Sequence, residues 1–511
     1  MKISNNSKKR RNGIVVFMAL MLFTFSANAQ NLAEFEKKVT EFTLDNGLRF
    51  IVVERHEAPV VSFHTYADVG SVDEVKGITG LAHVFEHMAF KGTNTIGTKD
   101  LKEELKAMQK VDAAFEELRR ERHKGALADS SQLAELEKAF KEARETAKEF
   151  VVSNEIGEAI ERAGGVGLNA STSSDWTRYY YSLPSNKTEL WFSLESDRFL
   201  NPVLREFYTE KEVVMEERRM RTESNPIGRL LEEFVATAFK AHPYSEPVVG
   251  HMSDLESITR AEGKTFFKKF YGANNLIIAV VGDVKSKQIK KLAQNYFGRL
   301  PSAPKPDPVE TVEPPQLGER RVIVEDKSQP ILILGYHKGD VHHPDEPVFT
   351  VISDVIGRGR ASRLNKNLVK EKKIAVQASG ISGFPGVKYP NLMLFFAIPA
   401  QGKTAEECEI AIYEELERLK NEPVPEDELK KAKTRARADV IRQLNSNSGL
   451  ALQLAYKQAI TGDWRNLFKD LDKINGVTSE DIQRVAKKCF VSKNKTVALI
   501  KTIQDEGTDG Q

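Results

Sequence analysis

Residues 77–90 read GITGLAHVFEHMAF, and the segment HVFEH at positions 83–87 is the most informative part of the chain. The apolar residues around it recur with the spacing of one buried helix face, which predicts a short helix. On such a helix His83 and His87 are four positions apart, so both side chains lie on one face and can bind the same zinc ion. Glu86 lies beside that face, where its carboxylate can accept a proton from a water molecule at the metal. The alternative interpretation is two helix-surface histidines with ordinary polar partners.

A catalytic zinc site requires a third protein ligand, and a glutamate-rich segment further along the chain contains the candidates. Residues 208–221 read YTEKEVVMEERRMR, and Glu210 and Glu217 are seven positions apart, or two helical turns. Both carboxylates therefore point to the same side of a helix. We expect Glu217 to be the ligand, with its neighbour Glu216 as the alternative. We assign Glu210 to the catalytic group as a residue that supports a ligand or the local charge. Without the histidine motif, a solvated acidic helix would be the preferred interpretation.

The segment 101–153 separates these two motifs and is unusually polar, since 23 of the 50 residues from 101 to 150 are charged. Apolar residues recur at steps of three and four from Leu101 to Leu118 and again from Leu133 to Phe150. Each apolar stripe is narrow, which is typical of a coiled-coil seam. The pattern predicts a helical hairpin that projects from its domain. Such a hairpin is either a solvated structure without chemistry or an arm that docks a partner or gates a substrate.

The remainder of the chain indicates two related domains. Six prolines within residues 301–319 predict an extended linker. Residues 258–283 align without gaps on the segment that begins at Val477, and both read as a capped helix followed by a turn and an apolar strand. Chance similarity is the alternative. We therefore predict an α+β fold of two homologous domains, residues 30–300 and 320–511, each a mostly antiparallel sheet with helices packed on it.

The N-terminal 29 residues read as a signal peptide. A basic segment precedes the apolar run at residues 13–25, and Ala27-Asn28-Ala29 supplies the small residues of a cleavage site. We expect cleavage after Ala29 and export to the periplasm. An uncleaved anchor is the alternative, but the run is shorter than the roughly 20 residues that span a bilayer. The rest of the chain contains no comparable apolar segment, so we expect no stable membrane insertion.

Composition excludes some classes of partner and cofactor. The chain has 75 basic and 73 acidic residues, and this balance gives no electrostatic signature of nucleic-acid binding. Its two cysteines, Cys408 and Cys489, form no CxxC pair, so a cysteine metal site is not expected. We interpret them as isolated small apolar residues, although export would permit a disulfide.

The His-x-x-Glu-His order, inverted from the common zincin motif, and the later Glu-x6-Glu helix resemble the pitrilysin/insulinase family of zinc peptidases (M16). The resemblance covers essentially the whole mature chain. His87 and Glu217 are 130 positions apart, farther than is usual in the family, and the hairpin accounts for the excess. Further family-like motifs occur in the expected order, the first of them before the histidine motif and the others after it: Gly70–Glu74, Gly164-Gly165, Leu168–Thr172, Ala241–Tyr244 with Gly250, and Val281–Asp283.

The resemblance implies roles for the zinc-motif residues, for Glu217 and for two residues of the segment Leu168–Thr172. It implies one Zn²⁺ per chain, held by His83, His87 and Glu217, with Glu86 as the general base of a zinc endopeptidase. It also implies that Asn169 and Ala170 lie on an edge strand, where an extended peptide substrate would pair with the main chain. For Asn169, a turn residue at a strand end is the plain alternative.

The second domain departs from the family pattern. Members that cleave unaided resemble Leu-Arg-x6-Tyr there, whereas this chain has Val369 and Val376 at the arginine and tyrosine positions. Because valine donates no hydrogen bond to a peptide, the resemblance implies a hetero-oligomer with a related M16-like subunit that carries the Arg/Tyr pair. A slip in this alignment is the competing explanation for the two valines. The alternative functions are a self-sufficient homodimeric peptidase and a zinc-containing peptide-binding or assembly subunit without turnover. Glu86 argues against the last, since a structural site needs no base.

Overall fold

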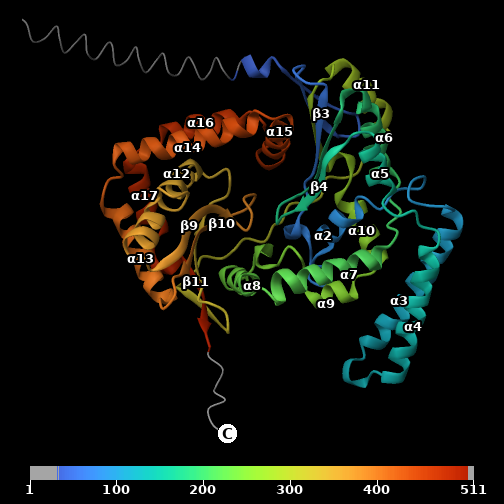
Figure 1. Ribbon diagram of the computed structural model, residues 1–511, viewed down its shortest axis with the longest axis horizontal. Coiled ribbons are helices and arrows are strands. Elements are labelled where there is room, and N and C mark those ends of the chain that lie inside the picture. The colour runs from blue at the N-terminus through green and yellow to red at the C-terminus, as the bar shows by residue number, and fades with distance from the viewer. Residues whose placement is uncertain (1–31, 33, 504–511) are drawn as a thin grey trace, which may run out of the picture.

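The computed structural model describes residue 32 and residues 34–503, which form two β-sheets with helices packed on them (Figure 1). The first sheet has six strands in the order β1-β2-β6-β3-β5-β4, and the second has five in the order β7-β11-β8-β10-β9. The strands of the first sheet are β1 (Val39–Thr43), β2 (Arg49–Glu54), β3 (Val60–Ala67), β4 (Val166–Thr172), β5 (Thr177–Pro184) and β6 (Leu276–Gly282). Those of the second are β7 (Arg320–Asp326), β8 (Leu332–Lys338), β9 (Ala375–Phe384), β10 (Asn391–Pro399) and β11 (Lys495–Thr502).

The helices divide between the two halves of the chain. The first half contains α2 (Leu81–Met88), α3 (Leu101–Arg122), α4 (Ser130–Lys148), α5 (Glu155–Arg162), α6 (Thr188–Leu200), α7 (Phe207–Arg218), α8 (Pro226–Ala238), α9 (Met252–Ser257), α10 (Arg260–Phe270) and α11 (Ser286–Phe297). The second half contains α12 (Glu346–Ile356), α13 (Ala405–Asn421), α14 (Glu426–Leu444), α15 (Asn447–Thr461), α16 (Asn466–Gly476) and α17 (Ser479–Cys489).

The two sheets share one strand arrangement. When β2, β6, β3, β5 and β4 are matched to β7, β11, β8, β10 and β9, the two strand orders coincide. In each sheet one pair is parallel, β2 with β6 and β7 with β11, and the other pairs are antiparallel. The predicted α+β fold of two related halves with mostly antiparallel sheets is therefore confirmed.

Each half contributes one helix to the sheet of the other half. Helix α8 packs on the second sheet, where Phe234 joins Ile333 in a buried apolar cluster. Helix α15 packs on β3 and β6 of the first sheet, where Leu454 is fully buried. A sheet that is covered on both faces buries side chains on both. This exchange explains why β2 and β6 read as nearly continuous apolar runs.

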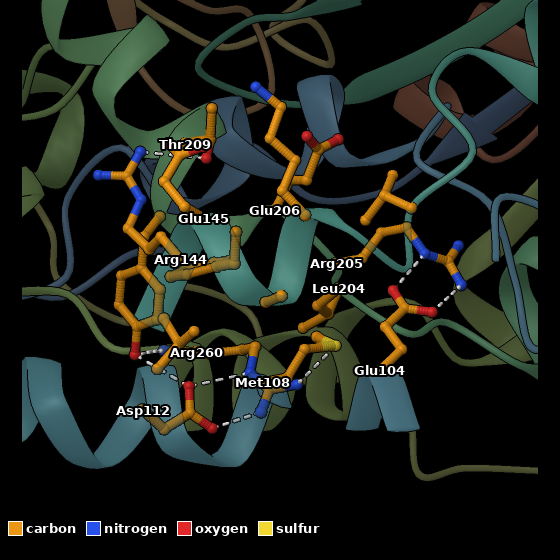
Figure 2. Close-up of a pocket in the computed structure, with 16 residues that line it drawn as sticks. Glu104, Met108, Asp112, Arg144, Glu145, Leu204, Arg205, Glu206, Thr209 and Arg260 are labelled. Atoms are coloured by element: carbon orange, nitrogen blue, oxygen red, sulfur yellow. Dashed lines mark hydrogen bonds and ion pairs between the residues drawn. The ribbon is translucent and has the colours of Figure 1, made fainter. Parts of the chain in front are cut away.

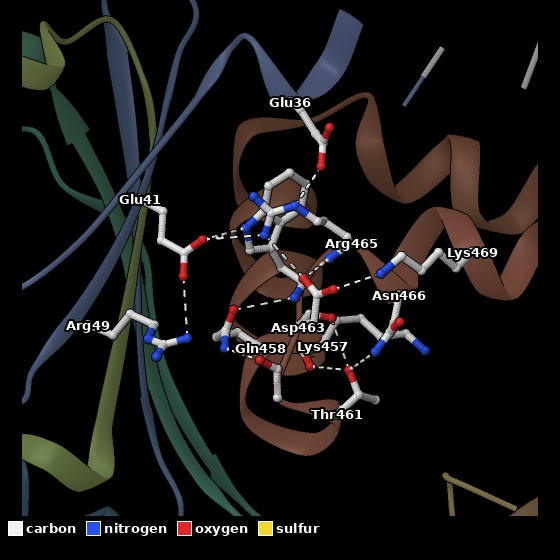
Figure 3. Close-up of polar contacts among 12 residues, drawn as sticks. Glu36, Glu41, Arg49, Lys457, Gln458, Thr461, Asp463, Arg465, Asn466 and Lys469 are labelled. Atoms are coloured by element: carbon white, nitrogen blue, oxygen red, sulfur yellow. Dashed lines mark hydrogen bonds and ion pairs between the residues drawn. The ribbon is translucent and has the colours of Figure 1, made fainter. Parts of the chain in front are cut away.

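Polar contacts beside α15 also join the two halves (Figure 3). The indole Nε1 of Trp464 donates to Glu41 Oε2 at 3.2 Å, and Arg465 Nε lies 2.5 Å from Glu36 Oε1. Trp464 lies in the turn between α15 and α16, whereas Glu41 belongs to β1. The two halves are thus connected by a buried apolar interface with charged contacts at its border.

The segment 101–153 contains two antiparallel helices, α3 and α4, which extend away from both sheets (Figure 1). Phe115 and Phe140 are buried, and their ring centroids are 5.3 Å apart. Leu105, which the sequence pattern also places in the seam, is 39% exposed. The buried stripe at this end of α3 runs through the neighbouring Glu104 instead, for which the apolar pattern contained no signal.

Three other sequence features have simple structural outcomes. Residues 301–319 contain no helix or strand. Cys408 and Cys489 are both free and buried. The predicted signal peptide at residues 1–29 lies outside the described residues. Within residue 32 and residues 34–503, no helix combines the length and the apolar character that a membrane span requires.

Candidate metal centre

Helix α2 carries the two motif histidines and is fixed at its N-terminal end. Gly80 precedes it with φ +92°, and a Cβ at this position would lie 2.7 Å from the carbonyl oxygen of Val249, so glycine is required. The buried carboxylate of Glu74 accepts hydrogen bonds from Gly80 N at 2.7 Å and Ala82 N at 2.6 Å. Burial raises the pKa of Glu74 well above its usual range. This role of Glu74 was not predicted, because its bonds close a turn whose conformation the local pattern leaves open.

His83, His87 and Glu217 lie together in the structure. The Oε2 atom of Glu217 is 3.6 Å from His83 Nε2 and 3.4 Å from His87 Nε2. One potential ligand atom from each of the three residues lies within 4.8 Å of the others. Two imidazole nitrogens and one carboxylate oxygen form a donor set that suits zinc. Burial lowers the pKa of His83 to about 4, which keeps its imidazole neutral, as metal binding requires. These residues therefore fit a zinc ion.

Helix α7 presents Glu217, and not Glu216, to the histidines. Glu216 is exposed and forms an ion pair with Arg219. On the buried side of α7, Val214 is fully inaccessible to solvent. The neighbouring Val213 is 44% exposed. Because Val213 and Glu217 are four positions apart, they share the open side of the helix.

Glu210 contacts the other ring nitrogen of His87. Its Oε2 lies 3.5 Å from His87 Nδ1, and its Oε1 lies 2.6 Å from Lys91 Nζ. Burial opposes ionisation, but the contacts with His87 and Lys91 outweigh it and lower the pKa of Glu210. A carboxylate on the second nitrogen of a ligating histidine orients the ring and raises its basicity. Glu210 is therefore placed to support a ligand and not to touch a substrate.

Glu86 lies in a cleft of about 820 Å³ together with His83, His87 and Glu217. Its Oε2 atom is 4.0 Å from His83 Nε2. Burial raises the pKa of Glu86, although hydrogen bonding with Thr172 opposes this shift. A carboxylate with a raised pKa next to a metal-type group suits a general base. The first half lines the cleft with β4 and α8, and the second half contributes Phe384 and Pro385.

Strand β4 contains Asn169 and Ala170, is an edge strand of the first sheet and lines the cleft. Asn169 pairs with Tyr180 in the ladder, so it lies within the strand and is not a turn residue at its end. Ala170 is buried, and its amide donates to the side-chain oxygen of the exposed Asn169. An edge strand leaves one row of backbone groups unpaired, and an extended peptide can bind to such a row.

Val369 and Val376 do not line this cleft. Val369 is partly buried in the π-helical turn η7 (Asn365–Glu371), and Val376 in β9 is 61% exposed. Among the described residues, those of the second half that line the cleft are Phe384 and Pro385. Neither valine thus contributes to the cleft of its own chain.

With the geometry established, comparison with known proteins identifies the class. A family model described as "Insulinase (Peptidase family M16)" matches residues 49–119 and 143–251, and one described as "Peptidase M16 inactive domain" matches residues 257–436. Together they cover more than half of the chain, and the unmatched residues 120–142 fall in the hairpin. The chain is a two-domain protein of the metallopeptidase type. It belongs to the insulinase family, peptidase family M16, as the sequence motifs indicated.

The relatives carry names of the same kind. The zinc protease PqqE of Helicobacter pylori is 29% identical over 496 residues, which cover 94% of this chain and 97% of that protein. A probable mitochondrial-processing peptidase subunit beta of Arabidopsis thaliana is 24% identical over 92% of this chain and 79% of its own length.

Solved structures agree with this placement. The crystal structure of a protease from Helicobacter pylori has a TM-score of 0.76 at 28% identity, covering 91% of this chain and 99% of that chain. A peptidase M16 inactive domain from Pseudomonas fluorescens has the same fold, with a TM-score of 0.72 at 17% identity over 92% of this chain and 99% of its own. The names of the sequence relatives imply that zinc is used in the family.

Proposed function

We propose that this chain is a zinc-dependent endopeptidase that hydrolyses peptides in the cleft beside β4. The observation that supports the proposal most strongly is the meeting of His83, His87 and Glu217 next to Glu86 in one cleft. Glu86 is not one of the three candidate metal ligands, and a purely structural metal site would have no use for a further carboxylate beside them.

The side chains would divide the reaction among them. His83, His87 and Glu217 would hold one zinc ion, which would polarise the scissile carbonyl and make a water molecule easier to deprotonate. Glu86 would accept the proton of the attacking water and return it to the leaving nitrogen. The free edge of β4 at Asn169 and Ala170 would hold the substrate in an extended conformation through main-chain hydrogen bonds.

The active form is proposed to be a hetero-oligomer in the periplasm. The side chains of Val369 and Val376 contain no hydrogen-bond donor, and a related subunit with an Arg/Tyr pair would supply such donors in trans. The similarity to a protein named as one subunit of a processing peptidase favours this arrangement. A self-sufficient homodimer is the second candidate, and the N-terminal signal-like segment supports export in either case.

The test is hydrolysis of a quenched fluorescent peptide by the purified mature chain, alone and mixed with the related subunit. Glu86→Gln should lower kcat by about 10²–10⁴-fold while the zinc content stays at one per chain. The matched control is Glu216→Gln, on the exposed side of α7, which should leave both unchanged. Full activity of Glu86→Gln would refute the assigned base. Chelator-sensitive activity of the lone chain would refute the split site and favour the homodimer.

A further inference from the structure

Lys91 lies behind the metal-type group, between two carboxylates. Its Nζ is 2.6 Å from Glu210 Oε1 and 3.1 Å from Glu206 Oε2. Glu210 in turn contacts His87 Nδ1 with its other oxygen, at 3.5 Å. All of these side chains are largely shielded, with Lys91 26% exposed and both glutamates below 15%. The ammonium therefore bridges two partly desolvated carboxylates and offsets part of their charge, and one of the two touches a candidate zinc ligand.

The backbone around Lys91 is wrapped around a second cation, Arg205. The Arg205 Nη1 donates to the carbonyl oxygens of Lys91 at 2.7 Å and Ile96 at 2.9 Å, and Nη2 donates to Thr93 O at 2.7 Å. Arg205 is also paired with Glu104 of α3, and both side chains are fully buried. Figure 2 shows this pair at the root of the hairpin, with Glu206 close by. The guanidinium of Arg205 thus connects residues 91–96, which follow α2, to Glu104 at the start of the hairpin.

The residues next to Arg205 have unusual backbone conformations. Leu204 and Glu206 have φ values of +54° and +56°, in the left-handed backbone region that residues other than glycine rarely adopt. In the segment that Arg205 holds, a Cβ at Gly92 would lie 2.4 Å from Arg205 Nη1, and a Cβ at Gly97 would lie 2.9 Å from it. With positive φ values at Leu204 and Glu206 and glycine at positions 92 and 97, Arg205 lies inside the turn and Glu206 lies against Lys91.

We infer that Lys91 is a positioning residue of the metal centre, which acts through Glu210 on the orientation of His87. The inference rests on the proposed zinc site and extends it by one layer. Without the ammonium, the carboxylates of Glu206 and Glu210 would repel each other in a partly desolvated space. Glu210 would then turn away from His87 Nδ1, and the ring would lose the acceptor that holds it in place. Loss of such an outer partner typically weakens metal binding by about 10–100-fold.

The experiment measures metal affinity and not activity. Zn²⁺ binding is determined by competition with a chromophoric chelator, and the visible absorption spectrum of the Co²⁺ form reports ligand geometry. Lys91→Met should weaken Zn²⁺ binding by about 10–100-fold and shift the Co²⁺ bands. Lys91→Arg, which keeps charge and donors, should restore the affinity to within about threefold. The control, Lys106→Met, removes an exposed lysine of α3 that pairs with Glu103 and should bind metal like the wild type.

A double-mutant cycle separates positioning from general damage. If Lys91 acts through Glu210, the variant with both Lys91→Met and Glu210→Gln should bind Zn²⁺ no more weakly than Glu210→Gln alone. Losses that multiply would overturn the inference, as would wild-type affinity of Lys91→Met. Melting temperatures of the metal-free proteins show whether Lys91→Met is folded, and Lys91→Gln, which also removes the charge, provides the same cycle if it is not. A wild-type protein that binds no Zn²⁺ would instead overturn the proposed function itself.

Discussion

His64 makes the stability of the protein depend on pH. It lies on β3 beneath α15, is 3% exposed, and its Nε2 is 3.2 Å from the hydroxyl of Ser448 in the other half. Its ring stacks on Tyr180 with centroids 4.9 Å apart. Burial, helped by the nearby charge of Arg178, lowers the pKa of His64 to about 3. The folded protein therefore keeps this imidazole neutral in its interface between halves.

The size of the effect follows from linkage. In the unfolded chain His64 has a pKa near 6.5, so below that pH the unfolded state binds a proton that the folded state rejects. The stability from neutral His64 is thus fully present above pH 6.5 and is lost progressively down to about pH 3. Between pH 7 and pH 5 the loss amounts to about 2 kcal/mol in the free energy of unfolding.

Urea denaturation of the wild type and of His64→Gln at pH 7 and pH 5 tests this prediction. Glutamine is neutral at both pH values and can still bond to Ser448, so the variant should lose about 2 kcal/mol less than the wild type on acidification. Other buried histidines, such as His242, contribute equally to both proteins and cancel in the difference. Equal losses in the two proteins would show that His64 is not held neutral, and the reasoning would be wrong.

Three further variants test the contacts that hold the structure together. Arg205→Met should lower the free energy of unfolding by about 3–5 kcal/mol in thermal melts, because Glu104 would keep a buried charge without a partner; a loss under 1 kcal/mol would contradict this. Phe115→Ala, which removes a buried ring from the hairpin, should cost about 3–5 kcal/mol and speed proteolysis between α3 and α4, and an unchanged cleavage rate would refute it. Asp175→Asn should destabilise by about 1.5–3 kcal/mol, since its carboxylate accepts from Tyr244 Oη at 2.5 Å and from amides of the second half; wild-type melting would show that this link contributes little.

Much of the architecture could be predicted from local patterns. A capped helix followed by an apolar strand occurs at residues 258–283 and again from Val477, and these segments became α10 with β6 and α17 with β11. The hairpin was visible for the same reason, since its apolar spacing is a property of each helix alone. The predicted burial of Leu105 in the hairpin seam was wrong, because the neighbouring elements determine which turn of a helix is covered.

Apart from the meeting of Glu217 with the two histidines, the contacts between distant segments described above were not predicted. In the sequence, α8 and α15 each show only an apolar helix face, and this face does not indicate on which sheet the helix packs. The roles of Glu74 and Lys91 were not predicted, because a lone acidic or basic residue has no periodicity. Their partners are defined by turns and by segments as far away as Glu210. The role of His83, His87 and Glu217 as zinc ligands stays a prediction, although the structure brings them together.

The spacing of four residues is enough to place His83 and His87 on one helix face with Glu86 beside it, because helical geometry converts that spacing into proximity. The spacing of seven residues places Glu210 and Glu217 on one face by the same rule. The motifs favoured Glu217 over Glu216 as the third ligand, but the fold is what brings the two helix faces together and turns Glu217 toward the histidines. The 130 positions between His87 and Glu217 include a hairpin that leaves and returns. Where the returning helix α7 lies depends on its packing against α2 and α9, which no local pattern encodes.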